Sequence, residues 1–239
     1  MTPRPADEVV TSGRGRQPER TTSTGTDDLA STGAPPSTAR GRAKAERRAA
    51  LLDAAARLFA RHGFDGVSLE DLGAAVGVSG PAVYRHFPSK QAVLVALLAG
   101  VSEGLLVGGR RVVADAPTAS DALTALVRFH ADFALAEPDV IRVQDRDLAA
   151  LAAPDQEEVR DLQRRYVDLW VDVLAHLDPS TDRPELRLRA QATFGLLNST
   201  PHSARGVSRS RTRDLLERMA LAALGHPSAE PGAPTRDTG

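Results

Sequence analysis

The stretch VSLEDLGAAVGVSGPAVYRHFPSKQAVLVALL, residues 67–98, decides the fold of this chain. It begins with the pattern of a helix start. The hydroxyl of Ser68 can accept from free backbone N–H groups, and the carboxylates of Glu70 and Asp71 suit the positive end of a helix dipole. We therefore predict a short helix over residues 69–76.

A tight corner and a second helix follow. Gly77 can adopt a positive φ at the corner, and Val78 can fill the corner from inside. Ser79 offers a second N-cap, and Pro81 is tolerated because the first helical turn has no N–H bond to lose. The second helix is predicted over residues 80–87. Two short helices joined by such a turn form a helix-turn-helix, which reads DNA.

Apolar residues of both helices form one seam, and Gly73 is small enough to let the helices cross closely. The seam comprises Leu72, Val76, Val78, Val83 and Phe87. Outside the seam, Arg85 could form two hydrogen bonds to a guanine, and Ala82 could contact a thymine methyl group. Tyr84 and His86 could donate hydrogen bonds to phosphate oxygens. The alternative is a pair of core helices with a solvated Arg–His pair.

Three sequence motifs of this region resemble those of the tetracycline-repressor (TetR, TetR/AcrR-type) family of bacterial transcriptional regulators. They are ARLFARHGF at residues 56–64, LGAAVGV at 72–78 and VYRHFPSK at 83–90, within a similarity that covers about residues 47–98. The chain departs from the family pattern at Gly73 and at Gly80-Pro81, which changes details of base contact. The resemblance implies a DNA-binding regulator and not an enzyme.

Charge is distributed as this interpretation requires. The whole chain carries a net charge of −1, but residues 40–90 contain nine Arg or Lys against five Asp or Glu, a net charge of +4. A basic segment of this kind is typical of a DNA-binding surface. The predicted DNA contacts are Arg40, Arg42, Ser68, Ser79, Gly80, Pro81, Ala82, Tyr84, Arg85, His86 and Lys90.

Composition also indicates the compartment. The chain has 41% hydrophobic residues, enough for a substantial core, and no cysteine, which fits a reducing cytoplasm. The N-terminus lacks the apolar core of a signal peptide, and the uncharged run over residues 91–102 is too short to span a bilayer. We expect a cytoplasmic, nucleoid-associated protein with no membrane partner.

The chain divides into four parts. Residues 1–39, rich in Thr, Ser, Pro and Gly, are predicted to be a disordered tail, and residues 226–239 a second one. Residues 40–88 form the predicted helix-turn-helix domain, and residues 89–225 the effector-binding and dimerisation domain. Arg40 and Arg42 could belong to a basic arm or to a solvated tail.

Helical periodicity recurs along the whole body, and no segment alternates as a strand would. We predict an all-α fold of about nine helices, an N-terminal three-helix DNA-binding domain followed by a helical bundle. The predicted helices span residues 43–62, 69–76, 80–87, 89–113, 120–136, 139–151, 155–177, 184–199 and 211–224.

In proteins similar to this one, the last two helices form a homodimer interface. A dimer would place two recognition helices about 34–36 Å apart, one turn of DNA, on a palindromic operator. The alternative for the same residues is ordinary intrachain core. The predicted interface residues are Leu186, Leu197, Leu215, Leu216, Met219 and Ala223.

The resemblance also implies a pocket for a small-molecule effector that releases the repressor from DNA. Such pockets are mostly apolar with a few polar groups. The candidate lining residues are Phe129, His130, Phe133, Arg142, Gln144, Tyr166, Trp170, Phe194 and Asn198. Each could also be core or solvated. The phrase FGLLNSTPHS at residues 194–203 resembles actinobacterial relatives, some of which sense lipid or acyl-CoA metabolites.

There are two alternative functions for this sequence. An all-helical enzyme would need a nucleophile with a base, a metal cluster or a phosphate-cradling loop, and the sequence shows none of these, so no catalytic residue, metal or cofactor is predicted. A ligand-blind DNA-binding regulator, or an activator, controlled by a protein partner is the remaining alternative.

Overall fold

The computed structural model describes residues 38–203 and 206–225, and the two predicted disordered tails lie almost entirely outside these residues. Only the end of the predicted N-terminal tail is described. There Thr38 accepts a hydrogen bond from the backbone N–H of Gly41 and caps the first helix, which begins at Ala39. The first helix therefore starts four residues before the predicted position.

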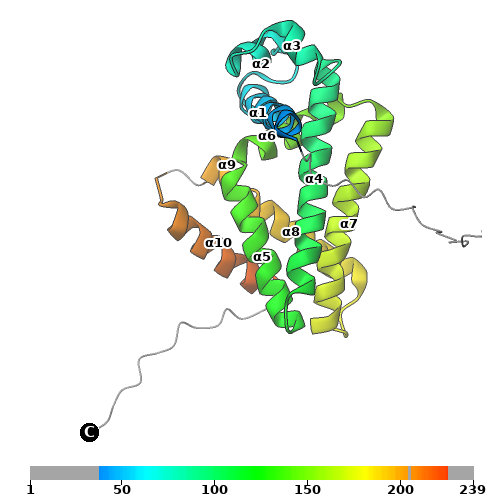
Figure 1. Ribbon diagram of the computed structural model, residues 1–239. Coiled ribbons are helices and arrows are strands. Elements are labelled where there is room, and N and C mark those ends of the chain that lie inside the picture. The colour runs from blue at the N-terminus through cyan, green and yellow to red at the C-terminus, as the bar shows by residue number, and fades with distance from the viewer. Residues whose placement is uncertain (1–37, 204–205, 226–239) are drawn as a thin grey trace, which may run out of the picture.

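Three helices form the N-terminal domain (Figure 1). They are α1 (Ala39–His62), α2 (Leu69–Ala75) and α3 (Gly80–Tyr84). The predicted cap of α2 is present as a full capping box, in which Ser68 and Asp71 each accept from the other's backbone N–H. Helix α3 ends at Tyr84 and not at residue 87, but Val83 and Phe87 lie in the predicted core.

The corner between α2 and α3 follows the predicted geometry. Gly77 has a φ of +69°, a conformation that other residues rarely adopt. A Cβ atom at Gly73 would lie 2.8 Å from the carbonyl oxygen of Val78 and 3.0 Å from a methyl of Val83. Glycine at position 73 therefore sets the close crossing of the two helices.

The remaining helices build the body (Figure 1). They are α4 (Lys90–Ala114), α5 (Ala119–Ala136), α6 (Pro138–Asp147), the 3-10 helix η1 (Leu148–Ala150), α7 (Ala153–Leu177), α8 (Arg183–Leu197), α9 (Thr200–Ser203) and α10 (Arg209–Ala223). Figure 1 shows α4 running from the N-terminal domain down through the body, beside α7. One apolar core packs α1, α2 and α3 against the first half of α4. A second core fills the space between α4, α5, α7, α8 and α10.

The fold class is confirmed: the described residues contain helices and no strand. The body holds one helix more than predicted, the short α9. Helix α4 is long and apolar enough to cross a membrane, with a mean hydropathy of 2.0 over an 18-residue window. It packs against α1, α5, α6 and α7, however, and buries Val93, Leu94, Leu97, Leu98 and Leu106 in the protein core.

Candidate DNA-binding surface and effector cavity

Tyr84, Arg85 and His86 lie together at the end of α3, and we call them the α3 trio. The side chain of Tyr84 is 52% exposed, Arg85 is exposed, and His86 is half-buried. A hollow lies on each side of the trio, one against the start of α1 and the other against the starts of α2 and α4. This arrangement leaves the end of α3 free to meet a large partner.

The first hollow is a basic groove of about 580 Å³. It is lined by Arg40, Ala43, Lys44, Arg47, Arg85 and His86. Burial and then the nearby cations, Lys44 and Arg47 first among them, lower the pKa of His86 below its usual 6.5. The groove therefore concentrates positive charge beside α3, as phosphate binding requires.

Sequence reasoning found three members of this groove, Arg40, Arg85 and His86, but missed Lys44 and Arg47. The missed residues lie four and seven positions after Arg40, on one face of α1. That periodic spacing of cations was the available signal. Arg42, predicted with Arg40, is exposed but does not line the groove.

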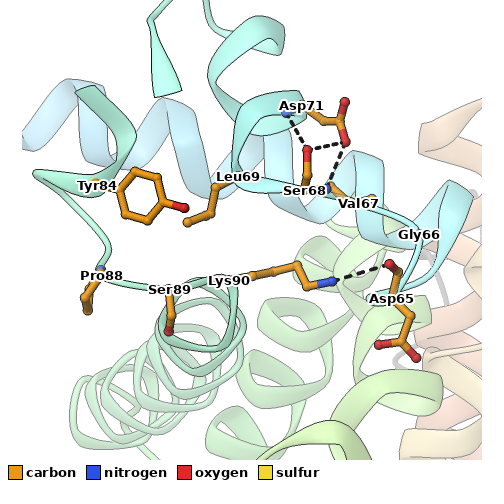
Figure 2. Close-up of a pocket in the computed structure, with 10 residues that line it drawn as sticks. All are labelled: Asp65, Gly66, Val67, Ser68, Leu69, Asp71, Tyr84, Pro88, Ser89 and Lys90. Atoms are coloured by element: carbon orange, nitrogen blue, oxygen red, sulfur yellow. Dashed lines mark hydrogen bonds between the residues drawn. The ribbon is translucent and has the colours of Figure 1, made fainter. Parts of the chain in front are cut away.

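The second hollow, of about 540 Å³, is open to solvent (Figure 2). Figure 2 shows the ring of Tyr84 beside Leu69, with its hydroxyl facing the hollow. Below it, α4 begins at Lys90, where the Ser89 hydroxyl accepts from the Ala92 N–H. The first N–H groups of a 25-residue helix thus lie at the edge of the hollow.

Lys90 lines the second hollow and also makes contacts within the domain. Its Nζ donates to the carbonyl oxygen of Phe64 at 2.8 Å and to that of Asp65 at 3.4 Å, and it lies 4.4 Å from the centre of the Phe64 ring. The lysine therefore ties the start of α4 to the loop after α1. Its predicted phosphate contact stays a prediction.

Two predictions for α3 are wrong, one of a DNA contact and one of a capping hydrogen bond. Ala82 is only 8% exposed, because α3 packs its middle, Ala82 and Val83, against the domain, so the methyl group cannot face DNA. Ser79 occupies the N-cap position but makes no capping hydrogen bond. Ser68, Ser79 and Pro81 are exposed and Gly80 is half-buried, and whether they touch DNA stays a prediction.

A cavity of about 200 Å³ lies within the body between α4, α5, α6, α7 and α8. Six of the nine predicted pocket residues line it: His130, Phe133, Gln144, Tyr166, Phe194 and Asn198. The lining residues that sequence reasoning missed are Ser102, Leu105, Ile141, Gln163 and Val167. Four of the five are apolar or hydroxyl side chains at ordinary core positions, which carry no signal of a cavity.

His130 joins the polar side of this cavity through both ring nitrogens. Nδ1 lies 3.3 Å from the hydroxyl of Tyr166, and Nε2 lies 3.0 Å from Oδ1 of Asn198. Burial lowers the pKa of His130 to about 4, so the ring is neutral. Since Oδ1 can only accept, Nε2 carries the proton and Nδ1 accepts from Tyr166.

Three predicted pocket residues lie elsewhere. Phe129 packs into the notch at Gly108, where a Cβ atom would lie 2.4 Å from its ring, and lines an outer groove. Trp170 is fully buried behind the cavity, with its ring centre 4.9 Å from that of Phe194. Arg142 pairs with Asp139 at 2.9 Å and donates to the Pro201 carbonyl at 2.6 Å.

The predicted dimer residues divide into two groups. Leu186 and Leu197 are fully buried and Leu216 nearly so, all in the intrachain core, so their assignment to an interface is wrong. Leu215, Met219 and Ala223 are exposed on α10. Beside them α8 exposes a strip that sequence reasoning missed, made of Leu188, Gln191, Ala192 and Gly195.

Comparison with known proteins identifies the family. Residues 51–97 match the family described as "Bacterial regulatory proteins, tetR family", and residues 116–202 match "Tetracyclin repressor-like, C-terminal domain". The HTH-type transcriptional repressor Rv1474c of Mycobacterium tuberculosis is 30% identical over 165 residues, which cover 59% of this chain and 88% of that protein. This chain belongs to the TetR family. It is therefore a transcriptional regulator and not an enzyme.

Another relative of this TetR-family chain is the HTH-type transcriptional repressor KstR2 of Rhodococcus jostii. It is 29% identical over 132 residues, which cover 55% of this chain and 65% of that protein. Two solved structures share the fold. A TetR-family regulator from Bordetella parapertussis has a TM-score of 0.66 at 24% identity, covering 77% of this chain and 98% of the other. AibR, solved with isovaleryl coenzyme A and operator DNA, has a TM-score of 0.61 at 18% identity. The match covers 72% of this chain and 97% of AibR.

Proposed function

We propose that this chain is a homodimeric repressor that binds a palindromic operator through α3 and leaves it when a small molecule occupies the cavity. The α3 trio carries this proposal, because it is exposed and lies beside a groove of four cations, Arg40, Lys44, Arg47 and Arg85. An exposed helix end with cations on its flank suits a major groove bordered by phosphates.

The residues divide into two roles. Arg85 has the planar fork that binds O6 and N7 of guanine, so we assign it to base reading. Arg40, Lys44 and Arg47 are assigned to phosphates, together with the N-terminus of α4 and the hydroxyl of Tyr84. The phosphate contacts supply affinity that is independent of sequence and falls with salt.

The outer face of α8 and α10 is the proposed dimer interface. Leu188 on α8 is 66% exposed, and Leu215 and Met219 on α10 are 47% and 45% exposed; apolar side chains exposed together on neighbouring helices are typical of a protein–protein interface. Ala192 and Gly195, which are small and also exposed on α8, would let two helices approach closely. A two-fold dimer through this face explains why the operator should be palindromic.

Release is proposed to run through α6. Ile141 and Gln144 line the cavity, and Arg146 on the same short helix donates to the carbonyl oxygens of Phe59 and Ala60 near the end of α1. A ligand that displaces α6 therefore moves a contact of the DNA-binding domain. Such a ligand favours a dimer whose two α3 helices are wrongly spaced for DNA.

A cytoplasmic location follows from the proposed operator. For the lipid or acyl-CoA effector that the sequence suggests, the cavity supports the acyl chain but not the coenzyme A moiety. The walls of the cavity suit an acyl chain, but a coenzyme A moiety needs cations for its phosphates, and the described lining includes no Arg or Lys. The proposed effector is therefore an apolar small molecule.

The proposal is tested by selecting duplexes from a random pool with the purified full chain. We expect a palindrome with half-sites about one helical turn apart, and affinity that falls steeply between 50 and 200 mM salt, roughly 10³-fold for six phosphate contacts. Screening cell metabolites against the complex should then find a compound that releases the duplex. Enrichment of no sequence would contradict the proposal.

A further inference from the structure

The cavity in the body carries an inference that rests on the proposed function and goes beyond it, because its lining shows which chemical class of effector fits. We infer that the effector is a small, uncharged, largely apolar molecule with one hydrogen-bond acceptor, such as a ketone, ester or lactone, which binds beside Gln163. Four observations support this inference.

The first observation is the absence of charge. The lining holds apolar, aromatic, hydroxyl, amide and imidazole groups, and among these described residues there is no Asp, Glu, Lys or Arg. Its one ionisable ring in the ordinary pH range, His130, is neutral and engaged at both nitrogens. A buried ion without a partner is strongly disfavoured, so an anionic or cationic effector would lose its hydration without compensation.

The second observation is a free donor. The side-chain amide nitrogen of Gln163 is buried and has no hydrogen-bond partner among the described residues. Buried donors are rarely left unpaired, and such a group in a cavity wall calls for an acceptor from the occupant. By contrast, Ser102 already donates to the carbonyl oxygen of Leu98 at 2.8 Å. The amide nitrogen of Gln163 is therefore a free hydrogen-bond donor in the cavity wall, and an effector that carries an acceptor oxygen would pair with it.

The third observation is size. A volume of about 200 Å³ is below the range of drug-sized pockets and equals that of roughly seven water molecules, so the occupant has on the order of ten non-hydrogen atoms. Leu105, Phe133 and Val167 supply apolar surface for most of them. A coenzyme A thioester is far too large for this space.

The fourth observation concerns the outer groove that adjoins the cavity. Leu105 and Phe133 line both the cavity and an outer groove between α4 and α5, so these two side chains form a wall that the cavity and the groove share. The charged residues of that groove are acidic. They are Glu137 and Asp132, the latter paired with Arg213. Since Arg213 pairs with Asp132, the Glu137 carboxylate is the charge that remains in this groove, and a carboxylate beside the cavity disfavours an anion, in agreement with an uncharged effector.

The chain contains one tryptophan, which makes the test direct. Trp170 packs on Phe194 and on His130, both lining residues, so its fluorescence reports occupancy. The full chain is titrated at pH 8 with three probes of matched chain length: 2-heptanone, heptanoate and heptylammonium. We expect saturable binding of 2-heptanone, with at least tenfold weaker binding of both ions. Equal or tighter binding of either ion would overturn the inference, and so would binding of none of the three.

The role of Gln163 is tested by Gln163→Leu, with Gln163→Met as a second variant and circular dichroism as a check of folding. The control is Glu158→Leu, which places a leucine on the exposed face of the same helix, α7. We expect about tenfold weaker binding of 2-heptanone in the Gln163 variants and no change in the control. Unchanged affinity in a folded Gln163 variant would overturn the assignment of the donor.

These titrations are made without DNA, so they are independent of operator binding. Ketone binding by a protein that selects no DNA sequence would contradict the proposed function and leave the effector class intact. A protein that selects an operator but is released by an anion would support the proposed function and contradict the inferred effector class.

Discussion

The guanidinium of Arg146 on α6 donates to the carbonyl oxygen of Phe59 in the last turn of α1. The same guanidinium donates to both carboxylate oxygens of Asp147, at 2.9 Å each, and that carboxylate is largely buried. The side chain thus joins the helix that borders the cavity to the helix that supports the DNA-binding domain. It also satisfies a buried charge.

Arg146→Ala should therefore affect stability and DNA affinity without changing sequence preference. Loss of the partner leaves the Asp147 carboxylate buried and unpaired, which costs about 1–3 kcal/mol in the free energy of unfolding. Urea denaturation measures this cost. Operator affinity should fall, while the ratio of operator to scrambled-duplex affinity stays constant.

The matched control is Arg164→Ala, which removes an exposed arginine paired with Glu157 and Asp161 on α7. Exposed pairs contribute at most about 1 kcal/mol, so this variant should resemble the wild type. Equal effects of the two substitutions would argue against a special role for Arg146.

His130 should make stability depend on pH. Burial lowers its pKa from 6.5 in the unfolded chain to about 4 in the fold, so only the unfolded chain takes up a proton as the pH falls below 6.5. The contribution of the neutral ring is complete above pH 6.5 and is lost as the pH falls towards 4. Between pH 8 and pH 5 the free energy of unfolding should drop by about 2 kcal/mol from this residue.

Urea denaturation at the two pH values and one protein concentration measures this drop. His130→Gln should show a drop smaller by about 2 kcal/mol, whereas His176→Gln, which removes an exposed histidine on α7, should keep the wild-type drop. A His130→Gln protein with the full wild-type pH dependence would show that the ring does not titrate as described.

The exposed face of α8 and α10 makes the dimer testable by charge. Leu188→Glu should raise the dimer dissociation constant at least tenfold, about 1.4 kcal/mol, because it places a carboxylate in the proposed interface. Sedimentation equilibrium measures the constant. Val107→Glu changes an apolar residue that is 59% exposed on α4, and it should leave the dimer intact. A monomeric wild type would contradict the interface.

Local signals explain what could be predicted from sequence. The cap at Ser68 and the positive φ at Gly77 depend on neighbours within a few residues, so α2, the corner and the start of α3 follow directly from the sequence. The fold class follows from helical periodicity in the same way. The burial of Ala82 could not be predicted, because it depends on how α3 packs Ala82 and Val83 against the rest of the domain.

The rest depends on how helices are rotated against one another. Helix α8 carries leucines on two faces, and only packing decides that Leu186 is buried while Leu188 is exposed. Phe129 and His130 are adjacent on α5, yet one fills the notch at Gly108 and the other enters the cavity wall. Periodicity within a helix identifies its faces but does not say which neighbour each face meets.

The central claim is that the end of α3 reads bases, and Arg85 tests it most directly. Affinities of the wild type, Arg85→Ala and the charge-matched control Arg165→Ala on α7 are measured on the selected operator and on a scrambled duplex at the same salt concentration. We predict that Arg85→Ala lowers the ratio of the two affinities by about 1–3 kcal/mol, roughly 5-fold to 150-fold, while Arg165→Ala leaves it unchanged. Equal losses on both duplexes for Arg85→Ala would contradict the claim.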